Sequence, residues 1–318
     1  MIIMMAKYYS FFRYILVFFA LFLIESRVCA HRSPYRRNTI CVDTQQYIKS
    51  KEPIITVWIH GTSFSHRIIR GKPFYGRSEI CSHKELRRKT VLHTIGKGLR
   101  SFYNNASDCL YFFAWSGNLN ARERERAAEK LHASLHVLLK QYHVKHGVYP
   151  RLRLITHSHG GNVVLNLARI KSSDALIIDE LILLACPVQA LTMKYVRHPI
   201  FKNIYAFSSN LDLVQVIAPE LVRETIHRRL KRGVCIHRLP LSDRYFPLQA
   251  NLCNIKIKIN GRSILHSEFM GPRFLTSLPS CLAGLAQVKK EIAHVRDLTI
   301  SLYPPHIIIT IVPARGSG

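Results

Sequence analysis

The sequence predicts an α/β protein with a mainly parallel sheet and helices on both faces. Apolar runs of four to seven residues recur along the chain, with helix-like stretches between several of them. These runs lack the polar alternation of half-exposed strands, which indicates strands covered on both sides. The chain has 318 residues, 48% hydrophobic and 20% charged, which is enough for a single sizeable core.

The elements alternate along the chain. The predicted strands are 53–59, 109–115, 152–155, 179–185, 202–207 and 254–259, and the predicted helices are 91–103, 120–146 and 162–170. The long helix is amphipathic, because apolar residues recur in it at intervals of three and four. They are Ala127, Leu131, Leu135, Leu138 and Tyr142.

Other stretches are less determined. The connection 64–90 is expected to form a lid or the rim of a pocket. Residues 186–201 and 215–250 either cap a site or are surface elaborations, and no hydrophobic periodicity in them decides between these alternatives. The tail contains two strand-like pieces, 298–302 and 307–312, whose place in the sheet stays open.

The stretch 156–161, THSHGG, lies between a predicted strand and a predicted helix. A serine on a sharp strand-to-helix turn needs small neighbours, because the turn is strained and the helix packs closely on the strand. Gly160 and Gly161 provide that space. The pattern is close to the G-x-S-x-G nucleophile elbow, with Thr156 in place of the first glycine. It predicts Ser158 as a nucleophile, and an ordinary strand-turn-helix corner is the alternative.

A serine hydroxyl is a weak nucleophile, so it needs a histidine to take its proton and a carboxylate to orient that histidine. Both follow Ser158 in the order acid, then histidine. Asp212 stands in the polar turn after the strand 202–207, and His266 stands beyond the strand 254–259. This order predicts a catalytic triad along one edge of the sheet.

Other residues compete for these roles. Asp179 and Asp243 are alternative acids, and Glu268 stands close enough to the proposed base to compete as well. His237 is an alternative base. Asp212 also has an ordinary explanation as a turn or helix-capping residue.

The exit of the strand 53–59 predicts the other half of the site. A glycine there lets backbone N–H groups point into the space above the serine. We expect the N–H of Thr62 or Ser63 to form part of an oxyanion hole, with Gly61 permitting the turn and the N–H of His159 contributing from the elbow. A plain strand-ending glycine is the alternative.

Three segments carry a resemblance to a known superfamily: 57–62 (VWIHGT), 112–117 (FFAWSG) and 155–163 (ITHSHGGNV). Together they resemble the α/β-hydrolase superfamily and, within it, lipases and serine esterases, including the group similar to the inositol deacylase of GPI anchors. The resemblance covers about 53–270. It implies the α/β-hydrolase fold and an ester-cleaving enzyme with a Ser-Asp-His triad and no cofactor. It implies no particular substrate, because this fold hosts many activities.

The function we predict is a serine hydrolase that cleaves carboxylic esters, expected to be lipid or acyl esters, through an acyl-enzyme. An acyltransferase uses the same triad and differs only in whether an alcohol replaces water. A non-catalytic binding protein on the same fold is a third class, disfavoured because all three triad residue types are available. Acyl length, head group and oligomeric state are not legible in the sequence.

The N-terminal segment predicts export. A segment with basic residues precedes an apolar run, 14–24, and 28–30 (VCA) has the small-residue pattern of a cleavage site. The apolar run is shorter than the about 20 residues that span a bilayer. We therefore expect 1–30 to be a signal peptide cleaved near Ala30, and 31–318 to be a periplasmic or secreted catalytic domain. An uncleaved N-terminal membrane anchor is the alternative.

Such cleavage leaves seven of the eight cysteines, and the pairing of an odd number cannot be read from sequence. The candidate metal motif, His157-x-His159, flanks the elbow and is better explained by the turn. Neither a metal nor a cofactor is predicted.

The charge is strongly positive, with 46 Lys and Arg against 19 Asp and Glu, or +27 at pH 7. The basic residues gather at 31–37, 84–89, 122–126 and 223–232. A field of this size attracts anionic surfaces. Besides the ester or lipid substrate, an anionic membrane surface is therefore one candidate partner; a general bias toward solvated basic residues is the competing explanation. Nucleic acid is disfavoured, because no aromatic-basic stacking platform accompanies the charge.

Overall fold

The computed structural model describes residues 38–42, 53–62, 80–86, 91–99, 109–172, 176–216, 242–292, 297–303 and 306–312. All of them belong to one unit of the chain, Arg37–Gly318. The other unit, Met1–Arg36, lies outside the described residues, and so does the predicted signal peptide.

The strands are β1 Asn38–Val42, β2 Ile54–Ile59, β3 Ile80–Ser82, β4 Leu110–Phe113, β5 Arg151–His157, β6 Glu180–Leu184, β7 Ile204–Ser208, β8 Leu252–Ile259, β9 Arg262–Ser263, β10 Asp297–Tyr303 and β11 His306–Val312. The α-helices are α2 Val91–Gly98, α3 Ala121–His146, α4 Gly160–Leu165, α5 Leu213–Val216 and α7 Pro272–Ile292. Short 3₁₀ turns are η2 His83–Glu85, η5 Asn166–Arg169, η6 Met193–Arg197 and η7 His266–Met270.

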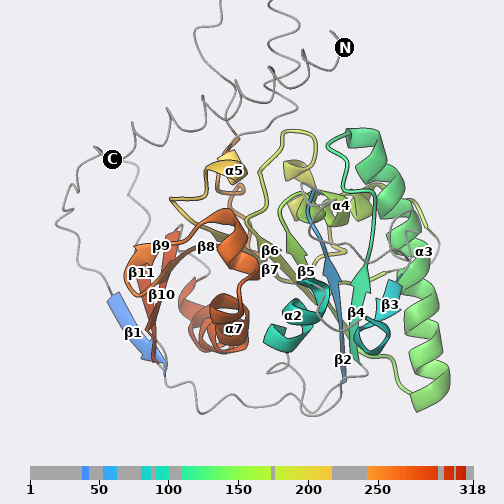
Figure 1. Cartoon of the computed structure of the whole chain (residues 1–318), viewed down its shortest axis with the longest axis horizontal. Helices are drawn as coiled ribbons and strands as arrows, with labels where there is room; N and C mark the ends of the chain where they lie inside the picture. The colour runs from blue at the N-terminus through green and yellow to red at the C-terminus, as the bar shows by residue number, and fades with distance from the viewer. Residues whose placement is uncertain are drawn as a thin grey trace, which may run out of the picture. The chain divides into compact units, whose positions relative to one another are not determined.

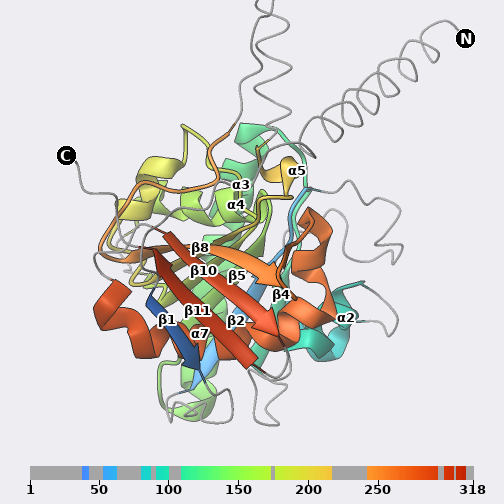
Figure 2. The ribbon, with the colours of Figure 1, turned by 90° about the vertical axis from the view of Figure 1, so that its left-hand side faces the viewer.

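The described strands form one mixed sheet, in the order β1-β11-β10-β8-β7-β6-β5-β2-β4-β3, with β9 paired to β8 (Figure 1). From β4 across to β10 all neighbours are parallel. Antiparallel pairs lie at the margins, where β3 joins β4 and where β11 joins β10 and β1, and the short β9 also pairs antiparallel with β8. Figure 2 shows β8, β10, β11 and β1 side by side at that second margin. The mainly parallel sheet predicted from the sequence is confirmed.

Two apolar cores lie on the two faces of the sheet. Alternate residues of a strand enter different cores: Leu181 and Leu183 of β6 pack with α3 and α4, whereas Ile182 and Leu184 pack with α2 and α7. The continuous apolar runs of the sequence follow from this arrangement, since a strand with helices on both faces has no polar side. The prediction of helices on both faces is confirmed.

The long helix α3 has clear signals at both ends. The Asn120 side chain accepts a hydrogen bond from the N–H of Arg122 at 2.9 Å, which caps the first turn. Gly147 ends the helix with φ at 73°, a left-handed conformation that costs glycine little. None of the helices in the described ranges is long and apolar enough to cross a membrane.

The sheet continues past residue 270. The helix α7 covers one face, and β10 and β11 extend the sheet beyond β8, so the strand-like pieces of the tail have a defined place. The tail therefore belongs to the same sheet that carries the predicted triad.

Candidate active site

The turn after β5 has the geometry of a strained elbow. Ser158 follows the last residue of this central strand and has φ at 54°, although it is not glycine. Its N–H donates to the carbonyl of Leu184 on β6 at 2.8 Å, and its carbonyl accepts from the N–H of Gly161 at 3.0 Å. A non-glycine residue in the left-handed region is rare and costs energy, so the surrounding structure must impose it.

Three glycines pack around this turn where no side chain fits. A Cβ on Gly160 would lie 2.5 Å from the carbonyl oxygen of His60, and one on Gly161 would lie 2.4 Å from the sulfur of Cys186. A Cβ on Gly61 would lie 2.7 Å from the Cβ of Ser158. The glycines therefore bring the end of β2, the elbow and the end of β6 into direct contact.

The exit of β2 is braced against the exit of β4. The Trp115 indole N–H donates to the carbonyl of His60 at 2.7 Å, and the Trp115 main-chain N–H donates to His60 Nε2 at 3.2 Å. Because Nε2 accepts, the proton of the neutral ring is on Nδ1, which donates to the Gly61 carbonyl at 2.7 Å. Thr62 follows Gly61 directly in the chain, whereas the other predicted oxyanion residue, Ser63, lies outside the described residues.

Asp212 and His266 are brought together by a direct contact. Asp212 is fully buried after β7, and its Oδ2 lies 2.8 Å from Nδ1 of His266, which follows β8 and β9. A carboxylate only accepts hydrogen bonds, so Nδ1 is the donor and Nε2 of the neutral ring is left without a proton. This is the tautomer that a general base for a serine requires.

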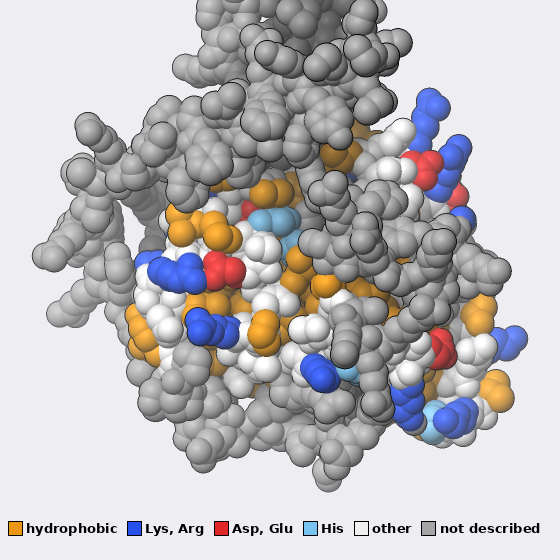
Figure 3. Space-filling model, viewed as in Figure 1, with side chains coloured by type: hydrophobic (Ala, Val, Ile, Leu, Met, Phe, Trp, Pro, Cys, Tyr) orange, Lys and Arg blue, Asp and Glu red, His pale blue; other side chains and the backbone are white. Residues whose placement is uncertain are grey.

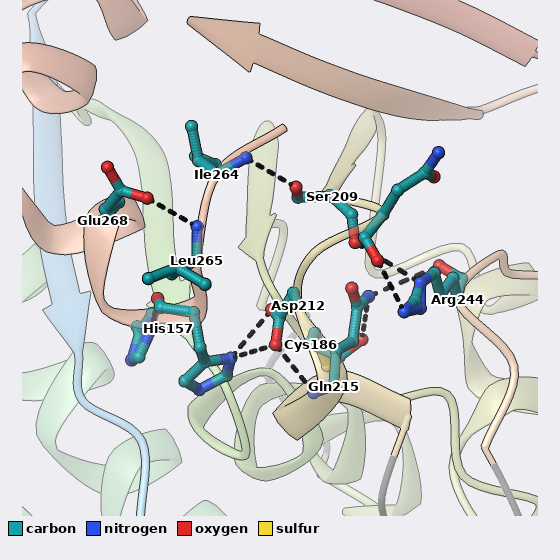
Figure 4. A network of polar contacts seen from close by, with 11 residues as sticks. His157, Cys186, Ser209, Asp212, Gln215, Arg244, Ile264, Leu265 and Glu268 are labelled. Carbon is teal, nitrogen blue, oxygen red and sulfur yellow. Dashed lines mark hydrogen bonds and ion pairs between the residues drawn. The ribbon is translucent and has the colours of Figure 1, made fainter. Parts of the chain in front are cut away.

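Neighbouring residues hold both loops in place (Figure 4). The N–H of Gln215 donates to Asp212 Oδ1 at 2.9 Å, and the N–H of Ile264 donates to the hydroxyl of Ser209 at 2.9 Å. The Arg244 guanidinium donates to the Asn210 carbonyl at 3.0 Å. The loop of the acid and the loop of the histidine are thus hydrogen-bonded to each other, and Arg244 also holds the loop of the acid.

The contact between the elbow strand and His266 is made by His157, the residue before Ser158. The imidazole of His157 lies 4.6 Å from that of His266, centroid to centroid, and its Nε2 is 3.1 Å from the His266 carbonyl oxygen. Among the residues that the structure describes, no hydrogen bond joins the Ser158 hydroxyl to His266. In ligand-free enzymes such bonds are often long and shorten when substrate binds.

Histidines around the elbow are buried and neutral. Burial, together with the nearby His266, lowers the pKa of His157 to about 3. Burial also lowers the pKa of His159 to about 3, with a contribution from the buried guanidinium of Arg124. Burial lowers the pKa of His60 as well. The site therefore keeps these imidazoles uncharged around the residue proposed to accept a proton.

The competing acids lie elsewhere or have other partners. Asp179 is at the opposite end of the strands and pairs with Lys202 at 2.8 Å. Glu268 accepts from the N–H of Leu265 at 2.7 Å and pairs with an arginine. Asp243 is exposed, and the alternative base, His237, lies outside the described residues.

No described residues form a group of three or more His, Cys, Asp and Glu side chains that could hold a metal. The nearest approach is on α3, where Nε2 of His132 and Nε2 of His136 are 3.2 Å apart. This His-x-x-x-His spacing is closer to a metal-binding pattern than His157-x-His159, but a tetrahedral zinc site uses three or four protein ligands. Cys81, Cys186, Cys253 and Cys281 are buried thiols rather than disulfides.

Two contacts of the site were not predicted from the sequence. They are the contact of His157 with His266 and the hydrogen bond from the Trp115 indole to the His60 carbonyl. The indole belongs to the segment 112–117, which carried the resemblance without a role. Its partner lies more than fifty positions away, so only the pairing of β4 with β2 reveals the contact.

Comparisons with known proteins found matches among solved structures alone. No family model and no curated protein match the sequence. Twelve chains of solved structures match it, among them esterase PE8, at 12% identity over 80% of this chain and 98% of that chain, with a TM-score of 0.38. A carboxyl esterase 2 from Tuber melanosporum is 11% identical over 84% of this chain and 88% of that chain, with a TM-score of 0.33. A lipase-esterase related protein from Clostridium acetobutylicum ATCC 824 is 15% identical over 52% of this chain and 54% of that chain, at 0.24.

These scores are too low to transfer any neighbour's activity to this chain. The fold rests on the chain's own topology, a mainly parallel sheet between two layers of helices. Ser158, Asp212 and His266 follow β5, β7 and β8 in chain order. This is the α/β-hydrolase fold that the sequence predicted.

Proposed function

We propose that this chain is a serine hydrolase that cleaves carboxylic esters. The hydrogen bond between Asp212 and His266 supports it most directly, because it places a carboxylate and an imidazole in the roles that activate a serine. The strained turn at Ser158 lies at the same edge of the sheet. Strain in a non-glycine residue is typical of functional sites.

In the proposed reaction, Nε2 of His266 takes the proton of the Ser158 hydroxyl as the oxygen attacks the ester carbonyl. Asp212 stabilises the imidazolium, and N–H groups of Thr62 and His159 bind the tetrahedral oxyanion. The alcohol leaves with the proton of His266, and an acyl-enzyme forms. Water, deprotonated by the same imidazole, then releases the carboxylic acid and restores the serine.

Exposed apolar side chains next to the acid and the base support an apolar acyl group. Leu211 precedes Asp212 and is 41% exposed, Val214 follows it by two residues and is 38% exposed, and Leu265 precedes His266 and is 43% exposed. On the face seen in Figure 3, hydrophobic side chains lie beside exposed histidine. Contact with an acyl chain removes such surface from water, at roughly 25 cal/mol per Å².

A fluorophosphonate probe on the purified protein tests the proposal. We expect the folded wild type to be labelled and Ser158→Ala to lose both labelling and ester turnover, by about 10⁵-fold or more in kcat. Ser277→Ala, which changes a half-buried serine on α7, serves as the matched control and should label as the wild type does. Labelling that persists in Ser158→Ala contradicts the assignment, and a folded wild type without labelling favours a non-catalytic protein.

Finer features of the proposal need separate assays. p-Nitrophenyl esters of increasing chain length, with and without anionic vesicles, distinguish a lipase at an acidic interface from an esterase for short acyl groups. Addition of a lipid alcohol separates hydrolysis from acyl transfer. An acylated inositol glycolipid tests the resemblance to GPI inositol deacylases, and sequencing the N-terminus of the exported protein tests cleavage near Ala30.

A further inference from the structure

His157 lies between three parts of the site. It is the last residue of β5, next to Ser158, and its side chain is buried. Its Nε2 is 3.1 Å from the main-chain carbonyl oxygen of His266, and the two rings are 4.6 Å apart and tilted by 54°. A Cβ on Gly61 would lie 3.3 Å from its Nδ1, so the ring also contacts the turn after β2.

The partner of Nε2 fixes the protonation of the ring. A carbonyl oxygen only accepts hydrogen bonds, so Nε2 carries the proton and donates it, while Nδ1 is unprotonated. Burial, together with the nearby His266 and His60, lowers the pKa of His157 to about 3 and keeps the ring neutral at ordinary pH. The contact is therefore a neutral hydrogen bond from the elbow strand to the backbone of the histidine loop.

The proposed chemistry explains why a neutral donor suits this place. His266 becomes positively charged when it takes the serine proton, and a second cation 4.6 Å away would oppose that step. His157 and Asp212 lie on opposite sides of the loop that descends from Leu265 (Figure 4). Asp212 holds the imidazole of His266, and His157 holds its main chain, so the two contacts restrain different parts of the residue.

We propose that His157 is a positioning residue for His266, whose Nε2–H holds the main-chain carbonyl of the catalytic loop and keeps the base aligned with Ser158. The inference rests on the proposed ester-cleaving function and extends it by one residue. A ring that only filled space would be replaceable by another ring of similar size. A hydrogen-bond donor is replaceable only by a group that places an N–H at the same reach.

Three substitutions separate these roles. His157→Phe keeps a ring and removes the donor, His157→Gln keeps an N–H near the position of Nε2, and His157→Asn carries the same amide one methylene shorter. We expect His157→Phe and His157→Asn to lower kcat by about 10²-fold with KM nearly unchanged, because a misplacement of about 1 Å costs that much. We expect His157→Gln to stay within about threefold of the wild type. His143→Phe, on α3 beside Tyr149, is the control and should leave kcat unchanged.

The same substitutions in a His266→Ala background test whether the effect acts through the base. We expect His157→Phe to lower the residual rate no further there, since no imidazole is left to align. Near-UV circular dichroism and thermal unfolding report whether each variant folds. If the phenylalanine variant does not fold, the comparison of glutamine with asparagine gives the answer.

Three results would overturn the role: a folded His157→Phe with wild-type kcat, a glutamine variant no better than the asparagine variant, or an equal loss of rate with and without His266. The proposed function fails in a different way, because the wild type then takes no fluorophosphonate label and turns over no ester. That outcome removes both proposals. A wild type that is labelled and active, together with a folded His157→Phe of wild-type kcat, removes only the role of His157.

Discussion

The two ends of the same parallel strands are built from different chemistry. At the amino end of β5 and β6, Arg151 and Arg153 both donate to Glu180, at 3.1 and 2.6 Å. Alongside, Asp179 accepts from the N–H of Leu152 at 2.9 Å as well as from a lysine. Charges at this end are satisfied by opposite charges and by the backbone.

At the carboxyl end the buried polar groups are mainly neutral. His60, His157 and His159 are held uncharged by burial, and the carboxylate of Asp212 is directed at His266. The backbone there is strained at Ser158 and again at Ala185, where φ is 53°. The amino end thus ties neighbouring strands together through paired charges, whereas the carboxyl end keeps its buried histidines neutral around His266, the imidazole proposed to accept a proton. Three predictions test this division.

The largest effect is expected at the carboxyl end. Asp212→Asn should lower kcat by about 10³- to 10⁴-fold, because the amide offers its N–H to Nδ1 and favours the wrong tautomer of His266. Stability should change little, since the asparagine oxygen still accepts from the N–H of Gln215. Steady-state kinetics and urea unfolding measure the two quantities. Asp243→Asn, at an exposed residue that forms an isolated β-bridge with Val188, is the matched control, and an equal loss of activity there would undo the assignment of the acid.

The second largest effect is expected when the pH is lowered, because the neutral histidines then make the free energy of unfolding smaller. The pKa of His157 and of His159 is about 3 in the folded chain and about 6.5 when unfolded, so the unfolded chain takes up protons first as the pH falls. Their contribution is complete above pH 6.5 and is lost as the pH falls toward 3. Each should cost about 2 kcal/mol of stability at pH 5. Urea unfolding at pH 7.5, 6 and 5 measures this, and His159→Gln should remove about half of the change. A free energy of unfolding that does not vary over this range speaks against neutral burial.

The smallest effect is expected at the amino end, on stability alone. Glu180→Gln should destabilise the fold by about 2–3 kcal/mol, because it removes the carboxylate on which the buried Arg153 donates. Lys202→Met, which breaks a half-exposed pair with Asp179, should cost less than about 1 kcal/mol. Thermal unfolding compares the two, and kcat should stay at the wild-type value in both. A loss of kcat without a loss of stability would mean that the two ends are not separate.

Several elements of the fold and the elbow were predictable from the sequence, because neighbouring residues in the chain specify them. The predicted strand 53–59 corresponds to β2, Ile54–Ile59, since a run of apolar residues ending in His60-Gly61 is typical of a buried strand followed by a turn. The helix 120–146 was predicted nearly to the residue from the recurrence of its apolar residues, and in the structure Asn120 and Gly147 form its boundaries. The elbow was recognised for the same reason, since its serine and glycines are adjacent in sequence.

Other elements carry no such signal. The strand β3 has three residues and depends on pairing with β4, and it falls within the stretch 64–90 that was expected to be a connection. The helix α7 has no predicted counterpart, and Pro279 stands inside it, a residue that usually ends a helix. The contacts that hold His266 come from β5, β7 and their loops, so only the assembled sheet brings them together.

The far margin of the sheet joins the beginning of the described chain to its end. The strand β1 pairs with β11, from Asn38 opposite Ile311 to Val42 opposite Ile307. A ribosome completes β1 more than two hundred residues before its partner exists, so this margin assembles late in synthesis. Until then β8 and later β10 present an unpaired edge, which is the kind of surface on which newly made chains associate wrongly. Early termination after β8 would make that exposure permanent.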